Sequence, residues 1–392
     1  MLTRLISAAT SKGRGRRTVS PVIERASTLL NDSTLQLSDA NLGPIYGIED
    51  MSAARELRTM IADMEDGVNT WLVPSGLMAV TVPLMALLKA GDEIVTTDAL
   101  YGPTRRFLTR FMAERGVKVR FHRADASSRE VAAALGRSTR MLLIESPASL
   151  TFEMLDVPML ADVCRARGIL TVMDNTWAAG LAFQPLSHGV DVSVQALTKY
   201  ANGHSDLLMG AITTRSVDLD TRIGECIEDI GSRVSSDEAW LALRGMRTLP
   251  LRLSAQADAA LMIGRWLLDR AEIAEVLYPP LPESRGHEIW RSTYTGAAAL
   301  VGLVLNGGSE DDAAAFIDAL TLFGIGYSWG GFESLVTLET QQLKRRAWPP
   351  ELAGPLIRLH IGLEASTDLI ADLDAALAVW RARQDSNLQP SA

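Results

Sequence analysis

The sequence predicts an α/β protein with a large domain built on a mostly parallel sheet and a smaller α+β domain at the C-terminal end. Its length of 392 residues exceeds that of one ordinary domain. Between residues 70 and 215, short apolar runs alternate with helical patterns, which is typical of parallel strands covered by helices on both faces. From about residue 246 the pattern changes to longer helices with isolated strands between them.

The strands expected in the large domain are short runs rich in Val, Ile, Leu and Met. In chain order the runs are NTWLVPSG, GDEIVTTD, VKVRFH, TRMLLIESPAS, GILTVMDNTW, DVSVQAL and LLMGAITT. A helical segment, LMAVTVPLMALLKAG, follows the first run directly. Because ligands gather at the carboxyl ends of parallel strands, the polar residues that end these runs are the first candidates for a functional site.

The smaller domain is expected to begin with a long amphipathic helix within residues 250–280, stopped by the pair Pro279–Pro280. A strand (GAAALVGLVLN), a helix (SEDDAAAFIDALTLF), a second strand (PLIRLHIGL) and a last helix at about 367–383 follow. The predicted divisions are therefore an N-terminal arm at 1–48, the large domain at 49–245, the C-terminal domain at 246–383 and a disordered polar tail at 384–392.

The composition indicates a soluble globular protein, with 47% hydrophobic and 22% charged residues. A net charge of −9 argues against nucleic acid or an anionic membrane as the main partner, and no apolar stretch is long enough to span a bilayer. Two cysteines far apart, Cys164 and Cys226, are typical of a reduced, cytoplasmic protein. The first residues, rich in Arg and Ser and free of acids, leave two interpretations, a targeting segment or an extended arm.

Three residues at the predicted strand ends suggest a cofactor site. Gly76 begins a helix, where backbone N–H groups and the helix dipole favour a phosphate. Asp174 closes a buried strand, and a buried carboxylate needs a cationic partner such as a protonated pyridine nitrogen. Lys199 follows another strand and can form a Schiff base with an aldehyde. Phosphate, pyridinium and aldehyde are the three handles of pyridoxal 5'-phosphate (PLP).

Each of these residues also has an ordinary explanation when it is considered alone. Lys199 could be a surface lysine, Asp174 a helix cap and Gly76 a turn residue. Their joint occurrence at strand ends is what favours the cofactor site over three unrelated structural roles.

Five segments strengthen this interpretation, because they resemble motifs of the Cys/Met-metabolism PLP enzymes, and most of all of the cystathionine β-lyases. The segments are ESPASLTFEMLDVP, DNTWAAG, QALTKYANGHSD, YSWGGFESL and LIRLHIGLE, and the resemblance runs from about residue 20 to 383. It implies PLP fold type I and a homotetramer of active dimers. It also implies a lyase that converts cystathionine or a related thioether amino acid to a thiol, pyruvate and ammonia.

The resemblance assigns the reaction chemistry to four residues. Lys199 would carry the PLP and later move the Cα proton of the substrate, because burial and a neighbouring cation lower the pKa of a lysine. Asp174 would keep the pyridine nitrogen protonated, and Tyr101 would stack on the ring. Tyr46 matches a tyrosine of the arm that reaches from the neighbouring subunit towards the cofactor phosphate.

The resemblance also implies how cofactor and substrate are held. The amides of Gly76 and Leu77 and the hydroxyl of Thr198 would bind the phosphate. Arg358 would bind the substrate α-carboxylate through two parallel hydrogen bonds. The residues expected to line the substrate side are Tyr327, Ser328 and Trp329.

The chain departs from the family pattern just after Tyr46. Ile48 and Glu49 stand where arginines usually contact the phosphate and the distal end of the substrate, and Arg106 stands where β-lyases often have an acid. One interpretation is a substrate with a neutral or cationic distal group; the other is that Glu49 and Arg106 pair across the dimer. Arg55 or Arg58 could replace the lost phosphate contact. γ-Elimination or γ-replacement remains the alternative activity.

Other functional classes fit the sequence less well. GYSWG at 326–330 matches the G-x-S-x-G motif of hydrolases, but that motif needs a strand before the serine and a helix after it. The five histidines are scattered, without metal-ligand spacing. A non-enzymatic binding protein would tend to lose residues such as Lys199 and Arg358, which this chain retains.

Overall fold

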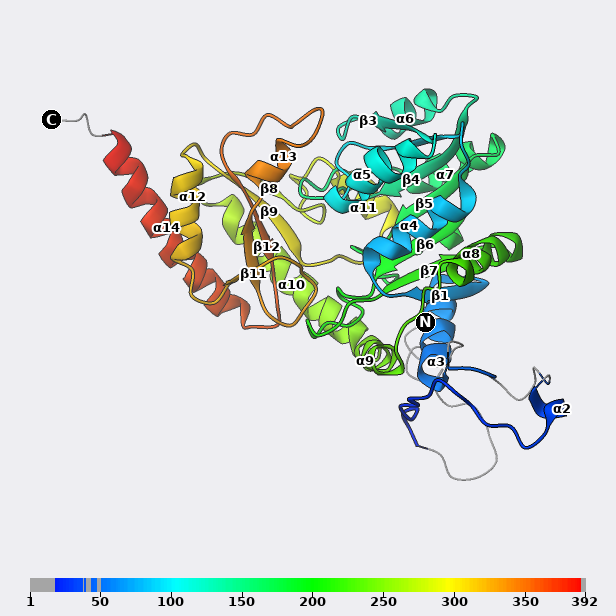
Figure 1. Ribbon diagram of the computed structural model, residues 1–392. Helices are drawn as coiled ribbons and strands as arrows, with labels where there is room; N and C mark the ends of the chain where they lie inside the picture. The colour runs from blue at the N-terminus through cyan, green and yellow to red at the C-terminus, as the bar shows by residue number, and fades with distance from the viewer. Residues whose placement is uncertain (1–17, 38, 40–43, 48–50, 389–392) are drawn as a thin grey trace.

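The computed structural model describes residues 18–37, 39, 44–47 and 51–388, which form a large domain and a smaller one (Figure 1). The large domain is built on a seven-stranded sheet. In spatial order its strands are β1 (Asn69–Val73), β7 (Gly210–Thr214), β6 (Val192–Ala196), β5 (Leu170–Asp174), β4 (Thr139–Glu145), β2 (Glu93–Thr97) and β3 (Lys118–His122). Only β7 runs antiparallel to its neighbours in this sheet, so the sheet is mostly parallel, as the sequence predicts.

Helices cover both faces of this sheet, which explains the near-continuous apolar strands. One face packs against α4 (Gly76–Leu87), the π-helix η2 (Phe107–Met112) and α8 (Val217–Asp229). The other packs against α3 (Ser52–Glu65), α6 (Ser128–Ala134) and α7 (Val157–Ala166). Along β5, Val172 belongs to the first core and Met173 to the second, so successive residues serve opposite faces.

The smaller domain contains a five-stranded sheet that is antiparallel except at one edge. Its order is β10 (Gly324–Ile325), β11 (Leu335–Leu338), β12 (Leu356–His360), β9 (Leu300–Leu305) and β8 (Ile273–Leu277). Figure 1 shows α12 (Glu310–Asp318) and α14 (Ser366–Leu388) side by side on the outer side of this domain. The shorter elements are α2 (Thr34–Leu37), α5 (Gly102–Arg106), η3 (Leu186–His188), α11 (His287–Thr293) and α13 (Thr340–Leu343).

Two helices, α9 (Ser236–Met246) and α10 (Leu249–Leu268), lead from the large domain to the smaller one (Figure 1). The helix expected within residues 250–280 therefore ends earlier than the sequence suggested, and β8 follows it. The segment Ile273–Leu277 pairs with β9, and sheet pairing overrides the helical pattern there. The pair Pro279–Pro280 consequently follows a strand instead of ending a helix.

The last helix also differs from the expectation. α14 continues to Leu388, past residue 383 and into the segment expected to be a disordered tail. Once a helix is nucleated and anchored by its packed turns, each further residue adds a hydrogen bond at little cost, so a polar sequence can extend it. The buried ring of Trp380 provides such an anchor.

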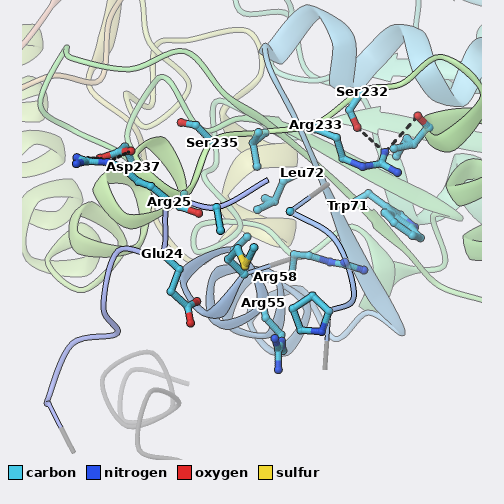
Figure 2. Close-up of a pocket in the computed structure, with 18 of the residues that line it drawn as sticks. Glu24, Arg25, Arg55, Arg58, Trp71, Leu72, Ser232, Arg233, Ser235 and Asp237 are labelled. Carbon is cyan, nitrogen blue, oxygen red and sulfur yellow. Dashed lines mark hydrogen bonds and ion pairs between the residues drawn. The ribbon is translucent and has the colours of Figure 1, made fainter. Parts of the chain in front are cut away.

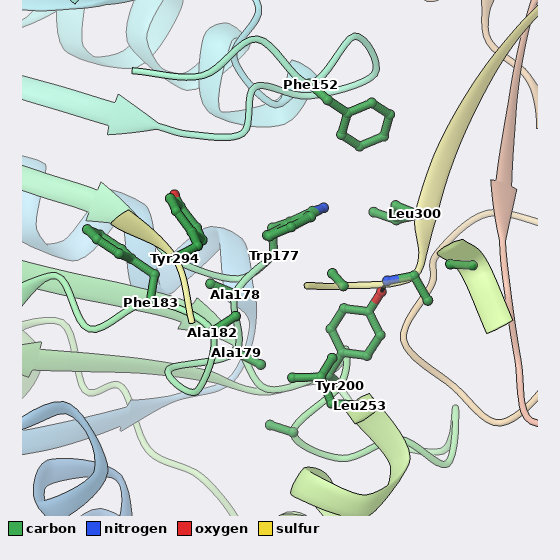
Figure 3. Packing of buried hydrophobic residues seen from close by; sticks show 14 of the residues in the cluster. Phe152, Trp177, Ala178, Ala179, Ala182, Phe183, Tyr200, Leu253, Tyr294 and Leu300 are labelled. Carbon is green, nitrogen blue, oxygen red and sulfur yellow. Dashed lines mark hydrogen bonds between the residues drawn. The ribbon is translucent and has the colours of Figure 1, made fainter. Parts of the chain in front are cut away.

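One hydrophobic core runs from the large domain into the smaller one. Figure 3 shows aromatic side chains of both parts in this cluster, among them Trp177, Tyr200 and Tyr294. The hydroxyl of Tyr294 donates to the carbonyl of Ser146 at 2.7 Å, and that of Tyr200 accepts from the amide of Ala299 at 2.7 Å. These bonds satisfy the buried hydroxyls and fix the domains against each other. Within the described residues, no helix is both long and apolar enough to cross a bilayer.

Candidate active site

The carboxyl ends of the parallel strands meet at one edge of the large sheet, where the smaller domain packs against it. Gly76 follows β1, Asp174 ends β5, and Lys199 lies three residues after β6. Tyr101 follows β2 at the start of α5. The strand ends predicted from the sequence are therefore brought together by the fold.

Lys199 is half-buried and faces a loop of the smaller domain. Its Nζ donates to Oγ of Ser328 at 2.7 Å and lies 5.2 Å from the ring centre of Trp329. Burial and the charge of Arg358 lower the pKa of Lys199 to about 8, although Asp174 acts in the opposite direction. A substantial fraction of this amine is therefore neutral near pH 8 and can act as a nucleophile or base.

Asp174 is held at the end of β5 by Thr176. Its Oδ1 accepts from the Thr176 amide at 3.0 Å and from the Thr176 hydroxyl at 2.5 Å. The same hydroxyl accepts from the amide of Ala196 on β6, which ties the carboxylate to the neighbouring strand. Burial raises the pKa of Asp174, while Thr176 and the charge of Lys199 oppose that rise.

The start of α4 lies unusually close to β6. A Cβ at Gly76 would lie 2.3 Å from the Cβ of Ala196, so only glycine permits this approach. The amides of Gly76 and Leu77 belong to the first turn, where N–H groups have no acceptor within the helix. Thr198 was also expected to bind the phosphate, and it directly precedes Lys199. In this structure its hydroxyl donates to the carbonyl of Met209 at 3.3 Å.

Tyr101 is positioned by an acidic residue, Glu145, that the sequence did not indicate. The amide of Tyr101 donates to Oε2 of Glu145 at 2.9 Å, and Glu145 is the register partner of Asp174 on β4. Burial and the charge of Asp174 raise the pKa of Glu145 to about 8, and a hydrogen bond from Ser149 opposes this. Burial, Asp174 and Glu145 also raise the pKa of Tyr101. Glu145 ends a strand at the same edge as Asp174, which is the signal that could have identified it.

Arg358 enters the same region from β12. Its Nη2 donates to the carbonyl of Ser328 at 3.3 Å, and its Nη1 lies 3.5 Å from Oε1 of Glu339. The side chain of Glu339 is fully buried. A buried acid therefore orients the guanidinium from behind, a contact that the sequence alone did not indicate.

The loop that carries Tyr327, Ser328 and Trp329 has an unusual backbone. Ser328 has φ of 90°. This backbone conformation is unfavourable in free energy for any residue other than glycine. Tyr327 is 78% exposed, whereas Trp329 packs against Tyr200 with the ring centres 5.3 Å apart. The next helix, α13, begins only at Thr340, so Ser328 lacks the strand–turn–helix context that a hydrolase nucleophile requires.

Other predicted residues lie away from the lysine or outside the described residues. Tyr46 forms an isolated bridge with Thr28 in the arm. Its neighbour Gly47 lines a cavity of about 790 Å³ between the arm, α3 and the segment joining α8 to α9 (Figure 2). Ile48 and Glu49 lie outside the described residues, so the suggested pair of Glu49 with Arg106 is untested. Arg106 is exposed on α5, where its charge lowers the pKa of Tyr101.

The two arginines suggested as replacements for the lost phosphate contact line that cavity and not the edge near Lys199. Arg58 lies over the ring of Trp71 at 4.4 Å and donates to Oδ1 of Asn69 at 3.0 Å. Arg55 is drawn beside it in Figure 2.

The residues at the sheet edge fit the three handles of PLP. Asp174 is a half-buried acid whose pKa is raised by desolvation, and a protonated ring nitrogen would supply a countercharge. The α4 N-terminus leaves amide donors for a phosphate, and Lys199 has a lowered pKa suited to forming a covalent bond with an aldehyde. No group of three metal-ligating side chains occurs within the residues that the structure covers.

Comparisons with known proteins agree with this geometry. The model of the Cys/Met metabolism PLP-dependent enzyme family matches residues 2–378. A cystathionine beta-lyase of Bordetella avium is 38% identical over 385 residues, which cover 96% of each chain. A cystathionine beta-lyase of Escherichia coli strain K12 is 35% identical over 392 residues, which cover 96% of this chain and 98% of that protein.

The solved structures include a cystathionine gamma synthase from Xanthomonas oryzae pv. oryzae in complex with aminoacrylate and cysteine. It superposes with a TM-score of 0.91 and 28% identity, over 97% of this chain and 98% of that one. The sequence match and the fold therefore point the same way: this chain belongs to the Cys/Met metabolism family of PLP-dependent enzymes.

Proposed function

We propose that this protein is a PLP-dependent carbon–sulfur lyase that acts by β-elimination on cystathionine or a related thioether amino acid, releasing a thiol, pyruvate and ammonia. The observation that carries the proposal is the contact between Nζ of Lys199 and Oγ of Ser328, 2.7 Å apart, at the edge shared with Asp174 and Arg358. The β-lyase relatives, at 35–38% identity over nearly the whole chain, favour β-elimination.

Substrate binding is assigned to Arg358. A guanidinium can hold a carboxylate through two parallel hydrogen bonds, and the buried acid Glu339 keeps this one from rotating away. The carbonyl of Ser328 accepts from the other side of the guanidinium. The α-carboxylate of the substrate is thereby directed to a fixed position close to Lys199, which orients its Cα hydrogen.

Proton transfer is assigned to Lys199. Its pKa of about 8 allows the amine, once released from the cofactor, to take the Cα proton and later to return a proton. Ser328 holds Nζ in one direction through its hydroxyl. Asp174 would pair with the protonated ring nitrogen of the cofactor, and Tyr101 provides a ring for stacking. When bound, PLP supplies the electron sink that accepts the electron pair left at Cα and returns it to expel the thiolate from Cβ.

The finer properties are part of the same proposal. We assign a homotetramer, in which Tyr46 of one arm would approach the site of the neighbouring subunit, and a cytoplasmic location. The free state of Cys164 and Cys226 is consistent with a reducing compartment. Glu49 and Arg106 would contact the distal end of the substrate, which favours distal groups other than that of ordinary cystathionine.

A trapping and product experiment tests the proposal. Borohydride reduction of the PLP-loaded protein, followed by peptide mapping, should place the label on Lys199. The product should be pyruvate from cystathionine, or from an analogue with a neutral or cationic distal group. Label at another residue would overturn the site assignment, and a four-carbon 2-oxo acid as the main product would replace β-elimination by γ-elimination.

A further inference from the structure

Helix α10 carries two buried polar residues on the face that it turns towards the candidate site. Arg252 is 9% exposed and Gln256 is 1% exposed, and they lie one helical turn apart. A buried guanidinium is costly unless its donors are satisfied. The partners of these two side chains therefore indicate what the helix holds in place.

Arg252 is satisfied by neutral oxygen atoms. Its Nη1 donates to the carbonyl of Tyr200 at 2.8 Å, and its Nη2 to the carbonyls of Gly245 at 2.8 Å and Ala201 at 3.4 Å. Its Nε donates to the hydroxyl of Thr248 at 3.1 Å. Burial lowers its pKa only to about 10, so the group stays charged at neutral pH, and no carboxylate of the described residues pairs with it.

Two of the three carbonyls that Arg252 binds, those of Tyr200 and Ala201, belong to the turn that carries Lys199, and the third, that of Gly245, belongs to α9. The amide of Gly203 donates to the carbonyl of Lys199 at 2.9 Å, which closes the turn around Tyr200 and Ala201. The charged guanidinium donates to the carbonyls of Tyr200 and Ala201 and so holds the turn in place. Gly203 has φ of +71°, and a Cβ there would lie 1.8 Å from Nη1 of Arg252. The guanidinium thus occupies space that a side chain at position 203 would need.

Gln256 holds the opposing loop. Its Nε2 donates to the carbonyl of Gly331 at 2.7 Å and to that of Ile361, just after β12, at 3.3 Å. The loop touches the lysine turn directly, since a Cβ at Gly330 would lie 2.7 Å from the carbonyl carbon of Lys199. One face of α10 therefore binds the backbone directly after Lys199, at Tyr200 and Ala201, and the backbone three residues after Ser328, at Gly331.

We propose that Arg252 and Gln256 are positioning residues: together they hold the turn that carries Lys199 against the loop that carries Ser328, and so fix the direction of Nζ at the site. Neither side chain is placed to touch a substrate. The inference rests on the assignment of Lys199 in the proposed function, and it deepens that assignment by naming what orients the lysine.

The test compares three variants with a matched control on the same helix. Arg252→Met removes all the donors of the guanidinium, Arg252→Lys keeps the charge but not the fork, and Gln256→Met removes the amide. Arg265→Met is the control, because Arg265 is an exposed arginine of α10. The measurements are kcat, KM and, on the apoprotein, the rate of covalent PLP capture followed by absorbance as a function of pH.

We expect kcat to fall by about 10- to 100-fold in Arg252→Met and Gln256→Met, because a small misplacement of a reacting group lowers the rate by that factor. KM should change by less than about threefold. The rate of PLP capture should fall in parallel, and its pH midpoint should move upward because a loosened amine becomes better solvated. Arg252→Lys should recover only part of kcat and of the capture rate, because one ammonium cannot reach all four acceptors.

The inference is overturned if kcat, capture rate and pH midpoint of the variants match those of Arg265→Met, even where thermal stability is lower. If Arg252→Met is recovered unfolded, Arg252→Lys and Gln256→Met decide by the same criterion. Failure of the proposed function looks different: borohydride would then leave no label on Lys199 in the unaltered protein.

Discussion

Lys199 and Ser328 belong to different domains, yet Nζ of the lysine donates to Oγ of the serine at 2.7 Å. The serine adopts φ of 90°, and its own carbonyl accepts from Arg358. A strained residue of the smaller domain thus connects the reactive amine of the large domain with the arginine assigned to the substrate carboxylate. Strain at such a position is tolerated where the surrounding structure determines it.

Two substitutions at Ser328 should separate its hydroxyl from its strain. Both Ser328→Ala and Ser328→Gly should lower kcat by about tenfold, because a hydrogen bond to a charged group contributes about 1.5 kcal/mol or more. Ser328→Gly should be more stable than Ser328→Ala by about 1 kcal/mol, because glycine accepts a positive φ without strain. Steady-state kinetics and urea unfolding measure the two effects. Equal stabilities of the two variants would show that the backbone at residue 328 stores no strain.

The reactivity of Lys199 in the apoprotein should depend on Arg358. The rate at which an amine-reactive reagent labels Lys199 should rise with pH around a midpoint of about 8, because only the neutral amine reacts. Arg358→Gln removes a cation that favours the neutral form, so the pKa of Lys199, and with it this midpoint, should move upward by about half a unit or more.

The matched control for this measurement is Arg106→Gln, which removes an exposed arginine that acts on Tyr101. It should leave the labelling midpoint of Lys199 in place. A midpoint unchanged by Arg358→Gln would mean that Arg358 does not lower the pKa of Lys199, and an equal change in both variants would mean that the effect is one of net charge and not of this contact.

The parts of this site that the sequence predicted are those fixed by local pattern. Lys199, Asp174 and Gly76 each end or follow a strand whose apolar run is evident, and parallel strands bring their carboxyl ends to one edge. The helix start at Gly76 and the strand end at Asp174 therefore followed from periodicity and from the polar residues that interrupt it.

The parts that the sequence did not predict depend on packing between distant segments. Glu339 contacts Arg358 because β11 pairs with β12, and Arg252 of α10 donates to the turn that carries Lys199. Neither contact produces a periodic pattern in the sequence. β8 was missed for a related reason: its five residues become a strand only because β9 offers an edge. Tertiary context, which a single sequence does not display, decided these cases.

The stability of the apoprotein should fall between pH 5 and pH 8 because of Glu145. Burial and the charge of Asp174 raise its pKa from 4.5 to about 8. Between these two pH values the folded state holds a proton that the unfolded state has released. The contribution of Glu145 to the free energy of unfolding is therefore complete below pH 4.5 and is lost as pH rises through about 8. The free energy of unfolding in urea, measured across this pH range, reports the loss.

Glu145→Gln should make that decline shallower, because glutamine cannot release the proton. Some decline should remain, since burial also raises the pKa of Asp174. The variant keeps an oxygen acceptor for the Tyr101 amide, which limits structural change. An unchanged slope in Glu145→Gln would mean that Glu145 is ionised in the folded protein across this range.

The close approach of α4 to β6 should make Gly76 intolerant of any side chain. In Gly76→Ala the new Cβ would lie 2.3 Å from the Cβ and 2.9 Å from the Cα of Ala196, so helix or strand must shift. We expect a loss of about 1–3 kcal/mol in the free energy of unfolding, the usual cost of overpacking. PLP affinity should also fall, because the first-turn amides of α4 move with the helix.

Gly136→Ala is the matched control for this substitution. Gly136 is exposed before β4, at the opposite edge of the sheet, and its new Cβ would have no neighbour closer than 3.9 Å. Its stability should change by no more than about 0.5 kcal/mol, and its PLP affinity should not change. Thermal unfolding of the apoprotein and fluorescence titration with PLP distinguish the two variants. If Gly76→Ala behaved like Gly136→Ala in both measurements, the tight junction between α4 and β6 would have no part in forming the cofactor site.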